Sequence, residues 1–431
     1  MSALAASLAW LPSQALAEST DGPANVCATG ATVAPGYVLN TLGVGLPTNQ
    51  IAFTDPATRW GEGMYIANPS GPPAVLKINP NGTVAPFTVD PMVPPAGFGV
   101  AVAEGGTLPN SMFISAGIAG SIGSGGIYQQ TLAGAGSVFR LPSFPDNDLA
   151  HFKLAELKNG VSGDTLSAVT VYMCGGLCAA LDVFDYDASA NLLGAYGISV
   201  AGIGAPALPN HAESPAGSGF PDRVYGANVD GLASSSAYFA GSLLSTTLPS
   251  TYSSLNAYVD TAFGGGVVGF GNDDYVLALA MNESGDTIGT RVYRVNPFGV
   301  AQLIVTVPVG DAISYFIERS GGLAFGRGGN FGKDLYFSAG DLICRLSAPD
   351  QDGDGVLDSV DNCPTVANPS QLNTDGDARG DACDLFPTNP NCNIVPGTDA
   401  RDAGMAWPWL APLAAISLLR GLRRGRARRA D

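Results

Sequence analysis

The sequence predicts an all-β protein whose largest part is a β-propeller of about six blades. Most apolar segments are short, rich in Val, Tyr, Phe and Thr, and bounded by Gly, Pro, Asn or Ser, and few show a helical period. The 431 residues include 57 Gly and 31 Pro, which are the residues that most often mark turns. Related segments recur over a long period, as expected when each blade is one four-stranded sheet. A pair of β-sandwiches is the alternative, and the long period makes it the less favoured one.

The internal repeat is clearest in two pairs of segments. Residues 99–117 align without gaps with residues 322–340, and seven of these 19 positions are identical. Residues 75–87 and 292–304 each place Asn-Pro-x-Gly between two strand-like segments, as a tight hairpin requires. Strand cores lie at residues 64–67, 112–115, 171–174, 237–240, 275–278 and 335–338. Their first-to-last separation of 271 residues over five intervals gives about 54 residues per unit.

This combination of repeats resembles NHL-type and gluconolactonase-like six-bladed propellers. The resemblance implies a divalent ion in the central channel, held by Glu, Asn and Asp. Candidate ligands are Glu62, Asp182, Asn228, Asp230, Asn272, Asp273 and Asn282. None of them matches the family's ligands residue by residue, so turn and surface roles are the favoured interpretation. The two histidines, His151 and His211, have no nucleophile motif beside them.

The ring of blades needs a closing strand. The last visible blade shows only two strands, at residues 335–338 and 342–346. We expect the N-terminal stretch at residues 37–42 to complete it, with a Cys27–Cys344 disulfide that locks the closure.

The acidic segment at residues 350–384 carries nine Asp and one Arg. Its first half places carboxylates at positions 1, 3, 5, 9 and 12 of an EF-hand-like loop, with Gly355 at position 6. A second loop repeats the spacing, but Ala378 replaces the position-6 glycine, and we expect weaker binding there. Such oxygen ligands suit Ca²⁺. The predicted ligands, including the position-7 residues, are Asp350, Asp352, Asp354, Val356, Asp358 and Asp361, then Asn373, Asp375, Asp377, Arg379, Asp381 and Asp384.

Residues 350–384 closely resemble a thrombospondin type 3 repeat, with the pattern DxDxDGxxDxxDNCPxxxNPxQxNxDxDxxGDxCD. The resemblance implies two Ca²⁺ ions in a helix-poor segment with a Cys363–Cys383 disulfide. Because almost no apolar core is present, ions and disulfide must carry this fold. A solvated acidic linker is the less favoured alternative.

Seven cysteines fit an exported protein in an oxidising compartment. Besides the two pairs above, we expect Cys174–Cys178 to bridge a small loop, which leaves Cys392 unpaired. The sequence alone does not fix this connectivity.

Both ends of the chain have the sequence pattern of targeting signals. Residues 1–17 form an apolar stretch that ends in Ala-Leu-Ala, typical of a secretory signal peptide. Residues 405–419 are apolar, and we expect them to form a helix. Six arginines follow, and they would keep the C-terminus on the cytoplasmic side of a membrane. This layout resembles bacterial C-terminal sorting signals of the PEP-CTERM or rhombosortase type. The expected organisation is therefore signal peptide 1–17, propeller 21–347, calcium repeat 348–392, linker 393–404 and sorting or membrane segment 405–431.

The net charge of -17 gives the main body no basic excess, which argues against nucleic-acid binding. We therefore expect an exported bacterial protein, extracellular or at the cell surface, that binds Ca²⁺ and recognises a glycan or a protein. The C-terminal segment would contact the membrane before any processing. A metal-dependent lactonase-like hydrolase or lyase acting in the propeller channel is the alternative, and non-catalytic recognition is favoured.

Overall fold

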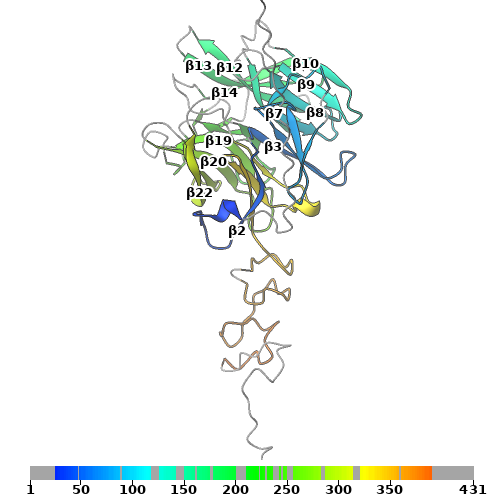
Figure 1. The fold of residues 1–431 in the computed structure, drawn as a ribbon. Coiled ribbons are helices and arrows are strands. Elements are labelled where there is room, and N and C mark those ends of the chain that lie inside the picture. The colour runs from blue at the N-terminus through cyan, green and yellow to red at the C-terminus, as the bar shows by residue number, and fades with distance from the viewer. Residues whose placement is uncertain are drawn as a thin grey trace, which may run out of the picture. The chain divides into compact units, whose positions relative to one another are not determined.

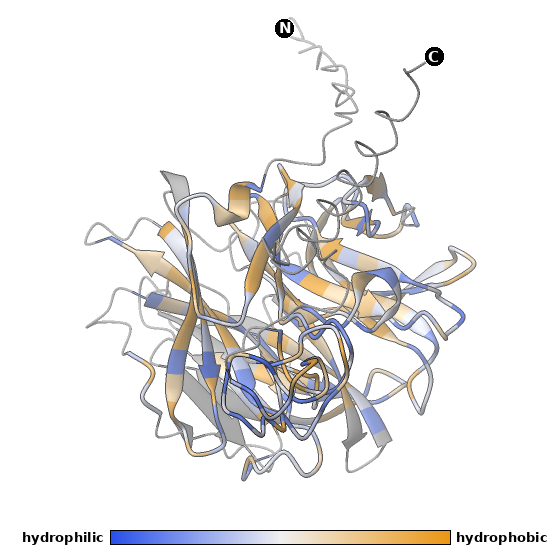
Figure 2. Cartoon of the chain, turned by 90° about the horizontal axis from the view of Figure 1, so that it is seen from below, coloured by the Kyte–Doolittle hydropathy of each residue, from blue (hydrophilic) through white to orange (hydrophobic). Residues whose placement is uncertain are grey.

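The computed structural model describes residues 25–390, except 47, 88–89, 118–125, 142–149, 161–162, 175–177, 200–209, 223, 229–230, 236–241, 244–245, 250–255, 283–286, 314–320 and 359–360. The chain divides into two compact units at Pro349 and Asp350. Unit 1 holds the β structure, and its strands are predominantly hydrophobic (Figure 2). Among the described residues, no helix is long and apolar enough to span a membrane. The predicted signal peptide, linker, C-terminal apolar helix and Cys392 lie outside the described residues.

The described strands of unit 1 form six antiparallel sheets in which consecutive strands pair as meanders (Figure 1). Three of these sheets come first in the sequence. Their strands are β3 (Gln50–Thr54), β4 (Gly63–Ala67), β5 (Val75–Ile78) and β6 (Val84–Pro86); β7 (Ala96–Ala103), β8 (Ser111–Gly117), β9 (Gly126–Thr131) and β10 (Gly136–Arg140); and β11 (Ala150–Gly160), β12 (Gly163–Cys174), β13 (Cys178–Tyr186) and β14 (Leu192–Ser199).

The other three sheets follow the same plan, but two of them recruit strands from the N-terminal segment. Their strands are β15 (His211–Glu213), β16 (Val224–Asn228), β17 (Gly231–Ser235) and β18 (Ser242–Leu243); β19 (Asn256–Phe263), β20 (Asp274–Met281), β21 (Thr287–Val295) and β22 (Ala301–Ile313) with β1 (Thr32–Val33); and β23 (Leu323–Phe325), β24 (Leu335–Ala339) and β25 (Leu342–Ser347) with β2 (Val38–Val44). Two short 3₁₀ helices, η1 (Val26–Ala28) and η2 (Gly329–Phe331), complete the described elements.

In each sheet, the edge strand that begins its meander faces the centre of a ring. β3, β7, β11, β15, β19 and β23 contact one another in that order, and β23 returns to β3. Each of these strands pairs with only one neighbour inside its own sheet, so the sheets radiate from their first strands. The predicted all-β class and the propeller arrangement are thus confirmed.

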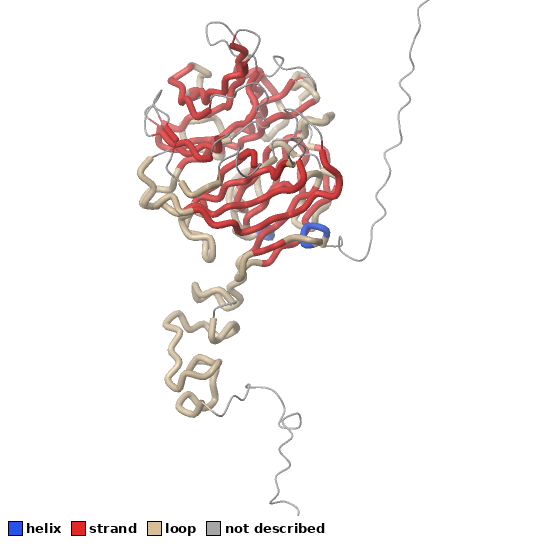
Figure 3. The backbone as a smooth tube through the Cα atoms, turned by 90° about the vertical axis from the view of Figure 1, so that its left-hand side faces the viewer, coloured by secondary structure: helices blue, strands red, loops and turns tan. Residues whose placement is uncertain are grey.

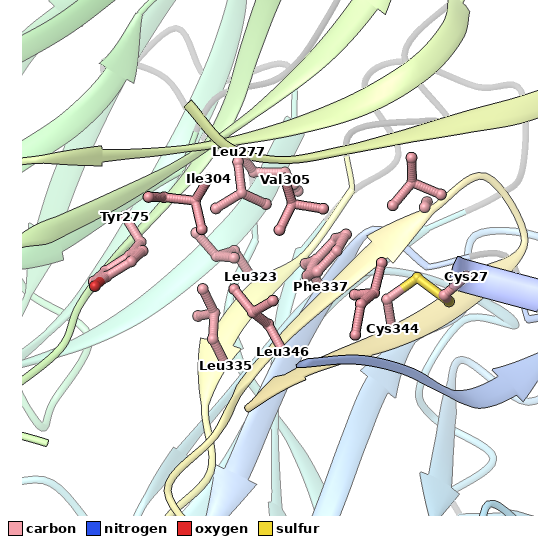
Figure 4. Close-up of a cluster of buried hydrophobic side chains, with 14 of the residues drawn as sticks. Cys27, Tyr275, Leu277, Ile304, Val305, Leu323, Leu335, Phe337, Cys344 and Leu346 are labelled. Carbon is pink, nitrogen blue, oxygen red and sulfur yellow. A yellow bond between two sulfur atoms is a disulfide. The ribbon is translucent and has the colours of Figure 1, made fainter. Parts of the chain in front are cut away.

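Ring closure follows the prediction from the sequence. β2 pairs antiparallel with β25, with Thr41 opposite Cys344. The Cys27–Cys344 disulfide joins η1 to β25, and both cysteines are fully buried. Figure 4 shows the disulfide beside Phe337 and Leu346 in an apolar cluster between two sheets. The N-terminal segment is therefore part of the last sheet and of its core.

The two Asn-Pro-x-Gly segments form the predicted hairpins. Asn79 accepts the backbone N–H of Gly82 (2.9 Å) between β5 and β6, and Asn296 accepts that of Gly299 (2.9 Å) between β21 and β22. Both glycines have positive φ, 81° and 78°, which explains their place in the motif. The aligned 19-residue segments are equivalent as well, since both contain the first two strands of a sheet.

Five of the six predicted strand cores are confirmed as strands. Five of the six predicted cores lie in β4, β8, β12, β20 and β24, each the second strand of its sheet. In the remaining sheet the second strand is β16, where Tyr225 is fully buried, and residues 237–240 lie outside the described residues. The glycine that follows Tyr225 interrupts the apolar run, so the sequence pattern favoured a later segment.

Unit 2 has loops and turns throughout its described part (Figure 3). Its Cys363–Cys383 disulfide spans 20 residues, as the resemblance implied. The backbone register places Cys174 opposite Cys178 at the end of the β12–β13 hairpin, and the disulfide between them stays a prediction.

Candidate metal centre

The two acidic loops of unit 2 have the same local hydrogen bonding. In the first loop, the position-9 carboxylate of Asp358 accepts the backbone N–H of Gln351 (2.7 Å). In the second, Asp381 accepts the backbone N–H of Thr374 (2.7 Å). The position-1 side chains repeat this equivalence, because Asp350 accepts the N–H of Gly353 and Asn373 accepts that of Gly376. Each loop is thus closed by its own side chains.

Five carboxylates in these loops share a distinctive geometry. One oxygen of each accepts a backbone N–H, while the other is buried without a hydrogen-bond partner. The bonded oxygens accept N–H groups at 2.7–3.2 Å, from residues two positions further along the chain. The five residues are Asp352 and Asp361 in the first loop, and Asp375, Asp377 and Asp384 in the second. Buried carboxylate oxygens without a partner are costly, and a cation removes that cost.

The structure brings only part of the predicted ligand set together. Carboxylate oxygens of Asp350, Asp352 and Asp354 lie within 4.8 Å of one another. The corresponding group in the second loop is Asp375, Asp377 and Asp384. Asp358, Asp361 and Asp381 lie outside these groups, and Asp381 uses both carboxylate oxygens on Thr374. The position-7 residues Val356 and Arg379 donate their N–H groups to Asp354 and Asp377, which sets the turn that orients their carbonyls.

The position-6 residues differ between the loops, as their sequences suggest. Gly355 has a φ of 94°, a conformation that a side chain disfavours. Ala378 is absent from the positive-φ residues of the described chain, so the second loop turns differently at this point. The first loop also contributes a carboxylate at position 1, where the second contributes only the amide of Asn373. Both differences favour tighter cation binding by the first loop.

The segment between the loops holds them together. Asn368 donates its backbone N–H to Asp354 Oδ2 (2.7 Å), and Gln371 Nε2 donates to Asp361 Oδ1 (2.8 Å). Gln371 adopts a left-handed conformation with a φ of 51°, which aims its side chain back at the first loop. Together with the disulfide, these bonds explain the Asn-Cys-Pro and Asn-Pro-x-Gln parts of the pattern.

Like charges concentrate in the first loop. Burial raises the pKa of Asp352, and the neighbouring carboxylates of Asp354, Asp361 and Asp350 raise it further. The same crowding makes a divalent cation more favourable there.

The channel candidates in unit 1 have other roles where they are described. Glu62 accepts hydrogen bonds from Asn330 Nδ2 (2.8 Å) and the N–H of Phe331 (2.9 Å), which holds η2 in place. Asp273 forms an ion pair with Arg294 (2.5 Å). Asn272 lies in the turn before β20, and Asn282 directly follows that strand. The side chains of Asp182 and Asn228, and all of Asp230, lie outside the described residues.

Two buried side chains join different inner strands, and no sequence motif marks either of them. Gln50 on β3 donates to the carbonyl of Leu154 on β11 (2.5 Å) and accepts from the N–H groups of Leu154 (3.0 Å) and Val100 (3.1 Å). Lys153 on β11 donates to the carbonyl of Gly321 (2.5 Å) and lies 3.6 Å from Asp260 on β19. Burial lowers the pKa of Lys153 and raises that of Asp260, while the attraction between them opposes both shifts. Only tertiary structure could reveal that these particular polar residues are buried, because their strands also carry other polar residues.

The end of unit 1 and the first acidic loop are similar to a known repeat family. A model of the thrombospondin type 3 repeat matches residues 339–371. No curated protein matches the chain. Similar solved structures include a DUF4623 family protein from Bacteroides eggerthii (10% identity, TM-score 0.41, 70% of each chain). The BP39L lectin from Burkholderia pseudomallei is also similar (14% identity, TM-score 0.37, 73% of this chain and 96% of the lectin). A third is the Bacteroides ovatus xyloglucan PUL protein GH43B (8% identity, TM-score 0.34, 65% of this chain and 60% of that one).

Proposed function

We propose that this chain is an exported calcium-binding protein in which a six-bladed propeller, one blade per sheet, presents a recognition surface. Two Ca²⁺ ions bind the loops of unit 2, one in each. The observation that carries the proposal is the set of five buried carboxylate oxygens that lack a hydrogen-bond partner, together with the family match over the first loop. The two disulfides support an oxidising, extracellular location.

The proposed ligands of the first ion are Asp350, Asp352, Asp354, the carbonyl of Val356, Asp358 and Asp361. Those of the second ion are Asn373, Asp375, Asp377, the carbonyl of Arg379, Asp381 and Asp384. Asp358 and Asp381, which now close their loops through backbone N–H groups, would act through their remaining lone pairs or through water, as position 9 often does. Bound ions would make the repeat a stiff element, since it has almost no apolar core.

Calcium titration of the oxidised full chain tests the proposal directly. We expect isothermal titration calorimetry to detect two Ca²⁺ ions per chain, because each loop holds its own carboxylate group. The change Asp352→Asn should abolish the tighter event and Asp375→Asn the weaker one. The matched control is Asp341→Asn, because this exposed residue lies outside both loops.

Two results would contradict the proposal that the loops bind Ca²⁺. Two events that survive both loop changes, or no calcium uptake by the unmodified chain, would show that the loops are a solvated acidic linker.

The recognition role of unit 1 is the second part of the proposal. Its partner would be a glycan or a protein, reached outside the cell. The support is the cavity at the ring centre, which residues from five inner strands line.

A further inference from the structure

The described part of the propeller contains an open cavity of about 290 Å³. Residues from five of the six inner strands line it, namely from β3, β7, β11, β15 and the β23 segment. This volume is close to the lower end of small-molecule sites, at about 300 Å³. The cavity therefore lies at the ring centre, where segments from far apart in the sequence converge.

A single buried side chain in this cavity lacks hydrogen-bond partners. His211 is 2% exposed, lines the cavity, and has no partner for either ring nitrogen. A buried imidazole would be expected to find a partner, because a buried polar group without one costs free energy. Since no described residue supplies a hydrogen bond to either nitrogen, His211 points to a bound group.

The hydrogen-bonding groups of His211 limit the chemical class of the ligand. Burial lowers the pKa of this imidazole to about 3, so the ring is neutral at physiological pH. A neutral imidazole presents one donor and one acceptor. Hydroxyl groups can satisfy both, whereas an ammonium only donates and a carboxylate only accepts. This favours a ligand with several hydroxyl groups.

The rest of the lining agrees with a neutral ligand. Glu156 and Glu213 add two carboxylates, and Arg327 adds one guanidinium that is already paired with Glu104. Because this guanidinium is the one cation among the described lining residues and is already paired, the lining offers little attraction to an anion. Acidic groups close enough to hold a metal occur, among the described residues, only in the loops of unit 2. Phe53 and Phe325 offer apolar surface for the C–H face of a ring.

We propose that this cavity binds a neutral polyhydroxylated ligand the size of one sugar residue, with His211 as its central hydrogen-bonding group. The inference rests on the proposed recognition role of unit 1 and gives that role a site and a ligand class. Glu213, two residues along the same strand, would accept a hydroxyl, and Phe325 would pack against the ring.

The test uses the calcium-loaded full chain and a panel of neutral methyl pyranosides with gluco, galacto and manno configuration. Saturation-transfer NMR should detect binding of at least one of them. His211→Phe should weaken it by tenfold or more, since Phe fills the space and removes both hydrogen bonds. His211→Asn keeps a donor and an acceptor and should retain part of the binding.

A matched pair of charge-neutralising changes supports the assignment. Glu213→Gln alters the cavity lining and should weaken the same sugar. Glu62→Gln removes the same charge from a residue outside the lining and should leave binding unchanged. Circular dichroism of each variant confirms that unit 1 is folded.

The idea is overturned if no pyranoside binds, or if bound sugar is insensitive to both His211→Phe and Glu213→Gln. Water would then be the partner of His211. Calcium uptake by unit 2 is measured in the same samples, so failure of the sugar site is distinguishable from failure of calcium binding.

Discussion

Removing the Cys27–Cys344 disulfide by Cys27→Ala and Cys344→Ala is expected to lower the free energy of unfolding of unit 1 by about 3–5 kcal/mol. The bond closes a chain segment with a sequence separation of 317, and long closures restrict the unfolded chain most. Both cysteines are fully buried in the cluster that joins the last two sheets, so their replacement also disturbs the core. Alanine is used in place of serine, because serine would bury a new hydroxyl group.

Guanidinium denaturation of the oxidised full chain, followed by near-UV circular dichroism, measures this loss. The matched control removes Cys363–Cys383 by alanine, because that bond spans only 20 residues within unit 2. We expect the control to weaken calcium binding and to leave the unit 1 transition in place. An unchanged midpoint after loss of Cys27–Cys344 would mean that the β2–β25 ladder alone holds the ring closed.

Lys153→Met is expected to destabilise unit 1 by about 3–5 kcal/mol near neutral pH. The change leaves the carboxylate of Asp260 fully buried without its cation, although the N–H groups of Thr261 and Leu323 still reach it. Lys153 also holds the carbonyl of Gly321, so one change releases contacts to two other sheets.

The pH dependence distinguishes this mechanism from simple loss of packing. Burial raises the pKa of Asp260 in the folded state, and removal of Lys153 takes away the interaction that lowers it. A group with a raised pKa in the folded state stabilises that state below its unfolded pKa, and this contribution is lost as pH rises. The penalty of Lys153→Met should therefore be smaller at pH 5 than at pH 8.

A double-mutant cycle tests whether Lys153 and Asp260 stabilise the fold through each other. Adding Asp260→Asn to Lys153→Met should recover part of the lost stability, because a neutral amide needs no counter-charge. A penalty that is equal at both pH values and additive in the cycle would refute the role of Asp260.

Sequence reasoning succeeded where a local rule decides the structure. The Asn-Pro-x-Gly hairpins and the closing strand depend on turn chemistry and an incomplete last repeat, and the Cys363–Cys383 disulfide was implied by the resemblance to the thrombospondin type 3 repeat. In the acidic loops, the alternation of carboxylates around a turn indicates the two groups Asp350, Asp352, Asp354 and Asp375, Asp377, Asp384, while the other predicted ligands lie outside them.

The remaining features depend on which strands meet at the ring centre. Gln50, Lys153 and Asp260 lie in three different strands that also carry other polar residues, so none of the three stands out in the sequence. For His211, the sequence shows no nucleophile motif beside it. Its place in a pocket that four other inner strands also line follows from ring geometry that no short pattern encodes. The glycine after Tyr225 likewise hid the β16 strand from a search for apolar runs.

The pairing of β2 with β25 also sets an order of events. The strand at residues 38–44 is among the first parts of the described chain to be synthesised, yet its partner is residues 342–347. β2 stays unpaired until some 300 further residues have been added, and a contact over such a sequence separation forms slowly. Folding is therefore expected to pass through an intermediate with one exposed strand edge, and the Cys27–Cys344 disulfide would form after β2 has paired with β25.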